Sequence, residues 1–245
     1  MKYYVIIAML LSTLLCAEVR TSYYKSGELR LKEEFHDNQR HGLSQGFYKN
    51  GKRYFEVTYA HGIPSGLARE YDRDGVLRMV KEYKAGTKIA EVSIKNGKKH
   101  GIERQFHANG NVSIEKTYRN GILEGVSKSF YDNGTVRVSL HVKHGEPDGE
   151  SREYFEDGTL KTLTPYQNGM INGQVKHYNH AGILEAEIPF RHDRREGTAY
   201  VYNHKGQRTH EIIFHDNAIH HGYAYGSTGE KRRISAEALK ALGLE

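Results

Sequence analysis

The sequence predicts an all-β protein, an elongated single antiparallel meander of stacked β-hairpin repeats with a short C-terminal helix. Glycine recurs every 24 residues with a single step of 35, and a second glycine follows each one nine residues later. An aromatic residue stands five residues after each first glycine. A period in this range is typical of repeat architectures, in which neighbouring units stabilise one another. The first glycines are Gly42, Gly66, Gly101, Gly125, Gly149, Gly173 and Gly197.

The composition limits the size of any core and the class of partner. Only 37% of the 245 residues are hydrophobic, so we expect a thin apolar layer instead of a deep core. The formal net charge of +6 is a mild bias toward anionic partners. Nucleic-acid binding calls for a clustered basic patch, which the sequence lacks, and we expect no nucleic-acid partner.

The first 17 residues resemble a signal peptide. Lys2 supplies a positive start, and the apolar run from Val5 to Leu15 is 11 residues long, too short for a bilayer that needs ~20. Ala17 is the expected cleavage residue. We therefore predict export, with a periplasmic or envelope-associated location. Two alternatives stay open, lipidation of Cys16 and an uncleaved anchor.

Residues 18–234 are predicted to form the repeat array, with eight units and a truncated ninth. Each unit reads as a strand of about six residues, a two-residue turn such as Asn50-Gly51, and a strand of about eight residues. Asn-Gly pairs favour a type I′ turn. Odd positions of the second strand should face the apolar layer and even positions water, because side chains alternate along a strand. A second turn with positive φ is expected at residues such as Gly62.

The step of 35 residues contains an insert at 87–97. Ile89 and the alternation of Val92 and Ile94 indicate one added strand, followed by its own Asn96-Gly97 turn. We therefore expect about 17 to 18 strands in all.

The last segment, 235–245, is predicted to be a capping helix. Ser235 suits the N-cap and Gly243 the C-terminal end, with helix formers from Ala236 to Leu242 between them. We expect this helix to cover the edge of the last strand, which would otherwise invite pairing with another chain.

Short motifs recur in the repeat units, namely Phe106-His-Ala-Asn-Gly110, Tyr118-Arg-Asn-Gly121, Leu123-Glu-Gly125 and Tyr131-Asp-Asn-Gly134. With these motifs the unit resembles the MORN repeat, and most closely the bacterial variant in the YwqK-family antitoxin repeat proteins. The resemblance covers about residues 18–225 and implies stacked hairpins that act as scaffolds for protein contacts, and in some members for lipid headgroups or membrane surfaces.

A ladder of basic residues is the candidate binding site. The third residue after the glycine is basic in five consecutive units, and the aromatic residue follows two positions later on the same face. Equivalent residues should lie ~10 Å apart, two strand spacings. In one interpretation the ladder binds an acidic partner, a glycan strand or anionic headgroups. In the other, the aliphatic parts of the Arg and Lys side chains cover the aromatic rings and the charged groups stay in water. Its members are Arg69, Arg104, Lys128, Arg152 and Lys176, with Tyr71, Phe106, Phe130, Tyr154 and Tyr178.

The sequence contains no recognisable catalytic or metal-binding motif. There is no HExxH motif, and no glycine-rich turn is followed by a predicted helix, as a dinucleotide or phosphate site requires. Many of the 15 histidines sit at turns before a glycine, one per unit, which separates them along the sheet. We therefore expect no enzyme, no metal site and no cofactor.

These observations together predict a non-enzymatic exported scaffold for protein–protein interaction in the cell envelope, with an unidentified protein as partner. Two alternatives remain. The basic ladder could bind anionic membrane headgroups or wall polymer, and the resemblance also implies an antitoxin-like protein that neutralises its partner.

Overall fold

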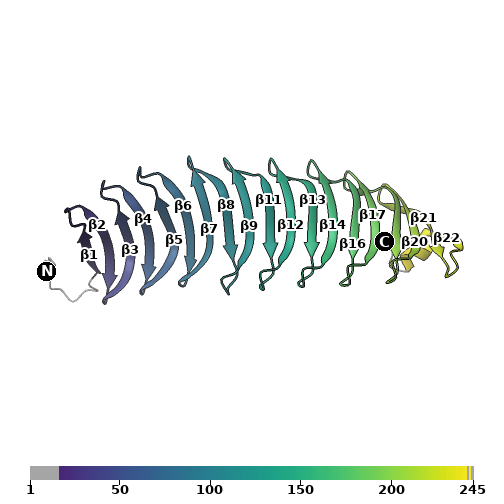
Figure 1. Cartoon of the computed structure of the whole chain (residues 1–245), viewed down its shortest axis with the longest axis horizontal. Helices are drawn as coiled ribbons and strands as arrows, with labels where there is room; N and C mark the ends of the chain where they lie inside the picture. The colour runs from purple at the N-terminus through teal and green to yellow at the C-terminus, as the bar shows by residue number, and fades with distance from the viewer. Residues whose placement is uncertain (1–16, 242, 244–245) are drawn as a thin grey trace. The chain divides into compact units, whose positions relative to one another are not determined.

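The computed structural model describes residues 17–241 and residue 243 (Figure 1). The described residues form antiparallel strands and one short helix, α1 (Ala236–Ala241), so the predicted fold class is confirmed. The predicted signal peptide lies outside the described residues except for Ala17, which begins the first strand. Contacts divide the chain into two compact units, which meet between Lys88 and Ile89 and are described separately.

The first unit is a meander in which each strand pairs antiparallel with the next. Successive arrows reverse direction along it in Figure 1. Its strands are β1 (Ala17–Tyr23), β2 (Leu29–His36), β3 (Gln39–Phe47), β4 (Arg53–Ala60), β5 (Ile63–Tyr71) and β6 (Leu77–Lys84).

The second unit continues the same pattern of antiparallel neighbours. Its strands are β7 (Thr87–Lys95, whose first two residues belong to the first unit), β8 (Lys98–Phe106), β9 (Val112–Arg119), β10 (Ile122–Leu123), β11 (Gly125–Phe130), β12 (Val136–Lys143), β13 (Glu146–Tyr154), β14 (Leu160–Gln167), β15 (Met170–Ile171), β16 (Gly173–Tyr178), β17 (Leu184–Arg191), β18 (Arg194–Arg195), β19 (Gly197–Tyr202), β20 (Arg208–His215), β21 (Ala218–Tyr225) and β22 (Lys231–Ser235).

The strand count differs from the expected 17 to 18. The structure has 22 strands among the described residues, because β10, β15 and β18 are two-residue pieces and because the ninth unit forms a second strand, β22, that pairs with β21. Each piece pairs with the same neighbour as the strand that follows it, so it is the start of that strand. The interruption falls at the residue before the repeat glycine. β7 lies within the segment where the sequence predicts an added strand.

The repeat glycine is required by its backbone conformation. Gly173 has φ +124, a conformation that residues with a side chain rarely adopt. A Cβ at this position would also lie 2.9 Å from Cγ of Pro165 on the neighbouring strand. The 24-residue period therefore marks a local irregularity in every first strand.

The sequence placed a type I′ turn at pairs such as Asn50-Gly51, but the structure has the type I′ pattern at the opposite end of the hairpins. At Asn50-Gly51 only the glycine has positive φ, +80, and its N–H donates to the carbonyl of Tyr48 at 2.9 Å. This is a three-residue loop with a left-handed glycine, so the type I′ prediction is wrong here. At the other end of the hairpins both turn residues have positive φ, as in His61 (+49) and Gly62 (+82). The predicted second turn is thus confirmed, and it is the one with the type I′ pattern.

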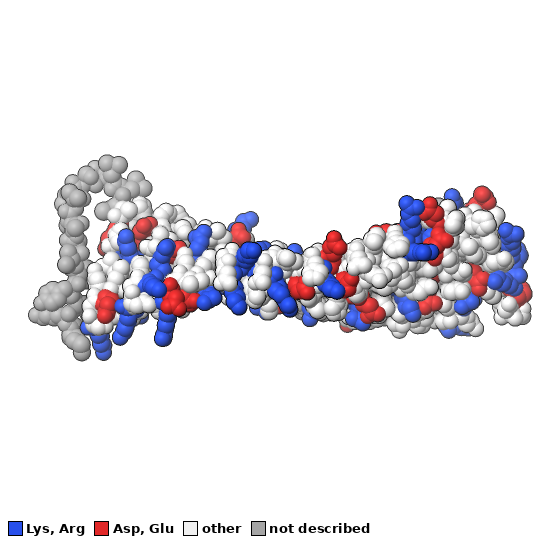
Figure 2. Space-filling view, turned by 90° about the horizontal axis from the view of Figure 1, so that it is seen from above, with Lys and Arg blue, Asp and Glu red and all other residues white. Residues whose placement is uncertain are grey.

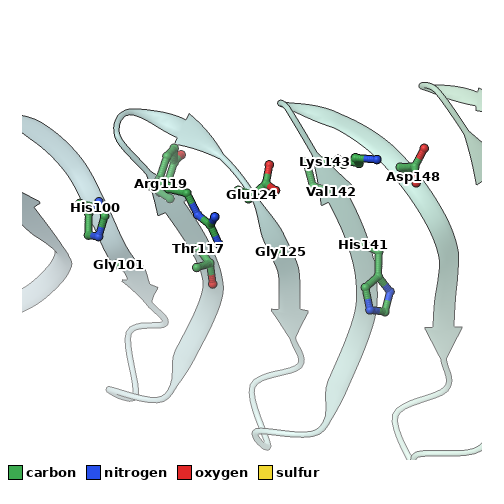
Figure 3. Close-up of a pocket in the computed structure, with 11 residues that line it drawn as sticks. His100, Gly101, Thr117, Arg119, Glu124, Gly125, His141, Val142, Lys143 and Asp148 are labelled. Atoms are coloured by element: carbon green, nitrogen blue, oxygen red, sulfur yellow. The ribbon is translucent and has the colours of Figure 1, made fainter.

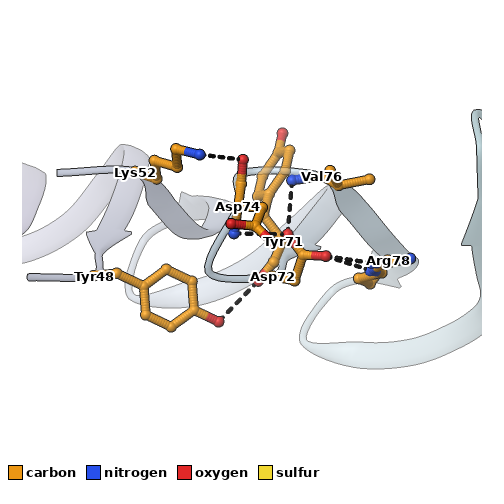
Figure 4. A network of polar contacts seen from close by, with 7 residues as sticks. All are labelled: Tyr48, Lys52, Tyr71, Asp72, Asp74, Val76 and Arg78. Carbon is orange, nitrogen blue, oxygen red and sulfur yellow. Dashed lines mark hydrogen bonds and ion pairs between the residues drawn. The ribbon is translucent and has the colours of Figure 1, made fainter. Parts of the chain in front are cut away.

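Hydrogen bonds along the loop edge join successive hairpins. In the first unit the hydroxyl of Tyr48 donates to the carbonyl of Tyr71 at 2.9 Å, and Nζ of Lys52 donates to the carbonyl of Asp74 at 2.8 Å (Figure 4). Within the next loop, the Asp72 carboxylate accepts the N–H of Asp74 and of Val76. Repeats are therefore tied by polar contacts as well as by the sheet.

The helix α1 closes an apolar cluster at the C-terminal end. Leu239 is fully buried against Ala199, Ile212 and Phe214. Its helix contacts β21 and β22, and Ser235 Oγ accepts the N–H of Ala238 at 3.2 Å, as expected of an N-cap. The contact that buries Leu239 is with a face of the sheet, whereas the sequence argument placed the helix over the strand edge. No helix in 17–241 is long and apolar enough to cross a bilayer.

Candidate binding surface

The register of the second unit places the predicted basic residues in one row that crosses the strands. Each basic residue pairs directly with a residue of the strand before it and the strand after it, and directly paired residues share a face. We call this row the central row and its side of the sheet the charged face. From β7 to β17 the row reads Glu91, Arg104, Glu115, Lys128, Ser139, Arg152, Leu163, Lys176 and Glu187.

The predicted aromatic residues form a second row on the charged face. Each lies two residues beyond its basic residue and pairs with an aliphatic residue across a shifted register. The shift moves the first aliphatic residue of the second strand to the charged face, so the predicted strict alternation is wrong at this position. The pairs of this aromatic row are Phe106 with Val112, Phe130 with Val136, Tyr154 with Leu160, and Tyr178 with Leu184.

Acidic side chains pair with several of the predicted cations. Arg104 lies between two carboxylates, with 2.8 Å from its Nε to Glu115 and 3.6 Å from its guanidinium to Glu91. Nζ of Lys176 lies 3.0 Å from Glu187, and this hydrogen bond raises the pKa of Lys176. Figure 2 shows basic and acidic side chains interspersed over the surface turned to the viewer.

The middle of the central row is different. Arg152 pairs with Glu150, which lies two residues away on the same strand and outside the row, and both side chains are more than 40% exposed. Lys128 forms no ion pair with any residue in the described part of the chain. Only Ser139 and Leu163 separate the three cations Lys128, Arg152 and Lys176 within the row, so no acidic residue of the row lies between them.

Arg69 and Tyr71 lie in the first unit, on β5. The hydroxyl of Tyr71 donates to Oε2 of Glu56 at 2.8 Å, and Arg53 and Gln45 contact the other oxygen. The structure thus brings together eight of the ten predicted site residues within the second unit, and it anchors Tyr71 in a separate polar cluster.

Buried carboxylates of this kind were missed by the sequence argument. Glu56 and Glu211 are only 9% exposed, although their even positions were expected to face water. Burial raises the pKa of Glu211, but hydrogen bonds from Lys231 and Tyr225 outweigh it and hold the pKa below its usual range. At Glu187, too, burial raises the pKa and hydrogen bonds outweigh it, including the one that Oε2 accepts from the hydroxyl of Tyr202 at 2.8 Å. These buried pairs could have been found in the sequence, because the glutamate stands 15 or 14 residues before the tyrosine that donates to it.

The opposite side of the sheet carries the thin apolar layer. Val175 and Ala199, which precede Lys176 and Tyr200 in their strands, are 6% and 2% exposed. Tyr118 shows how polar groups are accommodated there, because burial and a hydrogen bond with Glu103 raise its pKa to about 12. The most deeply buried apolar side chains therefore lie on the side opposite the central row.

A cavity of about 560 Å³ lies near the type I′ turns of the second unit (Figure 3). The labelled side chains come from separate strands and include His100, Arg119, Glu124, His141 and Asp148. Two of the acids accept hydrogen bonds from the backbone. Glu124 accepts the N–H of His144 at 2.9 Å, and Asp148 accepts the N–H of Asn168 at 3.2 Å. Among the described residues, no three His, Cys, Asp or Glu side chains are placed to hold a metal ion.

The repeats match a known family. The model of the MORN repeat variant matches residues 40–61, 99–120, 123–144 and 147–168. The search of curated proteins finds no match. One similar solved structure is that of a TarM mutant from S. aureus in complex with Fondaparinux, alpha-GlcNAc-glycerol and UDP, with 14% identity and a TM-score of 0.25. The match covers 44% of this chain and spans about a fifth of that protein, 19%. The four matched segments are MORN repeats of the variant type.

Proposed function

We propose that the protein is a non-enzymatic repeat scaffold of the cell envelope, and that the charged face of its second unit binds a protein partner. The single observation that carries this proposal is the run of Lys128, Arg152 and Lys176 in the central row, with uncharged residues between them. MORN repeats are in general non-enzymatic and suggest a scaffold for protein or membrane interaction, which agrees with this assignment.

The side chains of this row can exchange their present contacts for a ligand. Arg152 and Lys176 are 41% and 35% exposed, and exposed ion pairs contribute only about 0–1 kcal/mol. An incoming carboxylate can therefore replace Glu150 at little cost, whereas the partner of Lys176, Glu187, is half-buried and also accepts the hydroxyl of Tyr202. The neighbouring aromatic row supplies apolar contact area beside each cation.

A second candidate is binding of anionic headgroups or wall polymer by the same cations. The acids on both sides of the segment from Lys128 to Lys176 favour a protein partner, because Glu115 and Glu187 restrict this segment to a few strands. A flat anionic surface would meet these acids as well. An antitoxin-like role in which the scaffold neutralises its partner is a special case of protein binding on this face.

Charge reversal tests the proposal. The triple variant Lys128→Glu, Arg152→Glu and Lys176→Glu should lose partners that are cross-linked and captured from the native envelope. A control triple variant, Arg119→Glu, Lys143→Glu and Arg191→Glu, makes the same charge change at exposed strand ends beside the type I′ turns. It should keep those partners.

Thermal melting of both variants checks that they remain folded. Equal capture by the wild type and the first variant would overturn the assignment of the surface. Binding of the wild type to phosphatidylglycerol vesicles that weakens steeply with salt, without a captured protein, would favour the membrane candidate.

The proposed export has its own test. The intact mass of the protein recovered from the envelope should correspond to a chain that starts at Glu18. A mass that includes acyl groups on Cys16 would indicate lipidation, and the full-length mass would contradict cleavage.

A further inference from the structure

We propose that the charged face of the second unit recognises an extended acidic segment in the polyproline II conformation, with an acidic residue at every third position. This inference rests on the proposed function and names the chemistry of its partner. It depends on the segment of the central row from Lys128 to Lys176 and on the aromatic residues beside it.

The spacing of the cations selects this conformation. Lys128, Arg152 and Lys176 lie on every second strand, and two strand spacings amount to about 9.4–9.8 Å. A polyproline II helix rises ~3.1 Å per residue with three residues per turn, so equivalent residues recur every ~9.3 Å. Over the two intervals the mismatch stays below ~1 Å.

Other regular ligands fit less well. Side chains on one face of a β-strand recur every ~6.8 Å, which falls between the cations. On an α-helix, residues seven apart are ~10.5 Å apart, and the mismatch over two intervals grows to ~2 Å. The cation spacing therefore favours the three-residue period.

The aromatic row repeats with the same period. Phe130, Tyr154 and Tyr178 lie two residues along each strand from the cations, ~7 Å to one side. Aromatic-lined surfaces bind polyproline II segments through proline rings. A ligand with an acid at one position of each triplet and proline at another would place the two kinds of side chain on the two rows.

The ends of the site follow from the ion pairs. Arg104 is held between Glu91 and Glu115, which neutralise the row on one side. Beyond Lys176, the row continues with Glu187. The three cations between these acids correspond to three turns of the ligand, about nine residues.

Glu150 gives the inference a gain-of-function test. Its carboxylate pairs with Arg152 and would compete with an acidic residue of the ligand. The variant Glu150→Gln should therefore bind a twelve-residue peptide that repeats Glu-Pro-Ala at least threefold more tightly. The matched change Glu185→Gln removes an exposed carboxylate that forms no ion pair with a described residue, and it should leave the affinity unchanged.

The probes are four peptides of twelve residues. One repeats Glu-Pro-Ala, a second has the same composition with clustered acids, a third has the same composition with acids at irregular spacing, and a fourth repeats Lys-Pro-Ala. Titration of the full chain by fluorescence anisotropy at low salt should show at least tenfold tighter binding of the first peptide. The triple charge reversal should abolish that preference.

Each other outcome decides between the two proposals. Equal binding of the three acidic peptides, lost in the triple variant, would overturn the polyproline II inference and leave the proposed protein-binding surface intact. If no peptide binds and the triple variant still loses its envelope partners, the polyproline II inference is again overturned and the protein-binding surface stands. Failure of all peptides with partner capture unchanged by charge reversal would overturn both.

Discussion

The substitution Leu239→Ala tests whether the helix α1 stabilises the end of the array through one side chain. Leu239 is completely buried and belongs to the cluster with Ala199, Ile212 and Phe214. Its Cδ1 would lie 2.7 Å from a Cβ placed on Gly222, so the leucine occupies the space that this glycine leaves open. Alanine would remove that contact and leave a void.

The cost can be estimated from the atoms that are removed. Three carbon groups at about 0.8 kcal/mol each give about 2.4 kcal/mol, and buried Leu→Ala changes range over about 2–5 kcal/mol. A short helix at the chain end can move to fill part of the void, which favours the lower part of that range. We expect about 2.7 kcal/mol, equivalent to about a hundredfold change in a local opening equilibrium.

Hydrogen exchange measured residue by residue is the appropriate assay, because stability in a repeat array is mainly a matter of nearest neighbours. Amides of β20 and β21 should lose about a hundredfold in protection, while those of β12 should change little. The control Leu67→Ala changes a side chain that is 45% exposed and should alter stability by no more than about 0.5 kcal/mol. Unchanged protection in β20 and β21, or an equal loss in β12, would refute the reasoning.

Three further predictions concern the polar contacts and the glycines. The lowered pKa of Glu211 means that its contribution to stability is present above the unfolded-state value of about 4.3 and is lost as the pH falls through the folded-state value. Glu211→Gln should therefore weaken the loss of stability below about pH 5 in urea unfolding, and an unchanged pH dependence would contradict this. Gly173→Ala should lower the free energy of unfolding by at least about 1 kcal/mol more than Gly182→Ala does. Both glycines have positive φ, but only a Cβ at position 173 would meet a neighbouring atom, Cγ of Pro165, within 3 Å. Equal losses in the two variants would show that this contact relaxes freely. Tyr131→Phe removes a 2.8 Å hydrogen bond to the carbonyl of Tyr154 and should cost about 1 kcal/mol in the same assay, with no cost if water replaces the hydroxyl.

Much of the fold was predictable because its signals are local. A glycine at a turn indicates a positive φ at that residue. The recurrence of glycine and aromatic residues indicated successive hairpins. The assignment of turn types failed at Asn50-Gly51 because a two-residue and a three-residue loop can use the same dipeptide. Which of them forms depends on how the flanking strands pair.

The candidate site was predictable in its residue types and less so in its charges. The period placed Arg104, Lys128, Arg152 and Lys176 on one face, and their register confirms that placement. The carboxylate that holds Arg104 at 2.8 Å lies 11 residues away, on the next strand. Pattern analysis within a strand cannot show such a contact.

The sequence by itself determined the repeated hairpin, the positions of its turns and the face that carries the cations, since these depend on the conformation of a few adjacent residues. Only the tertiary structure decided which cations have a carboxylate directly opposite on both neighbouring strands, as Arg104 has and Lys128, Arg152 and Lys176 have not. A register shift in each hairpin determines which side chains meet across strands, and a carboxylate opposite an arginine cancels its charge where serine or leucine does not. For this reason the five-residue ladder of the sequence becomes a three-cation segment from Lys128 to Lys176 in the folded chain.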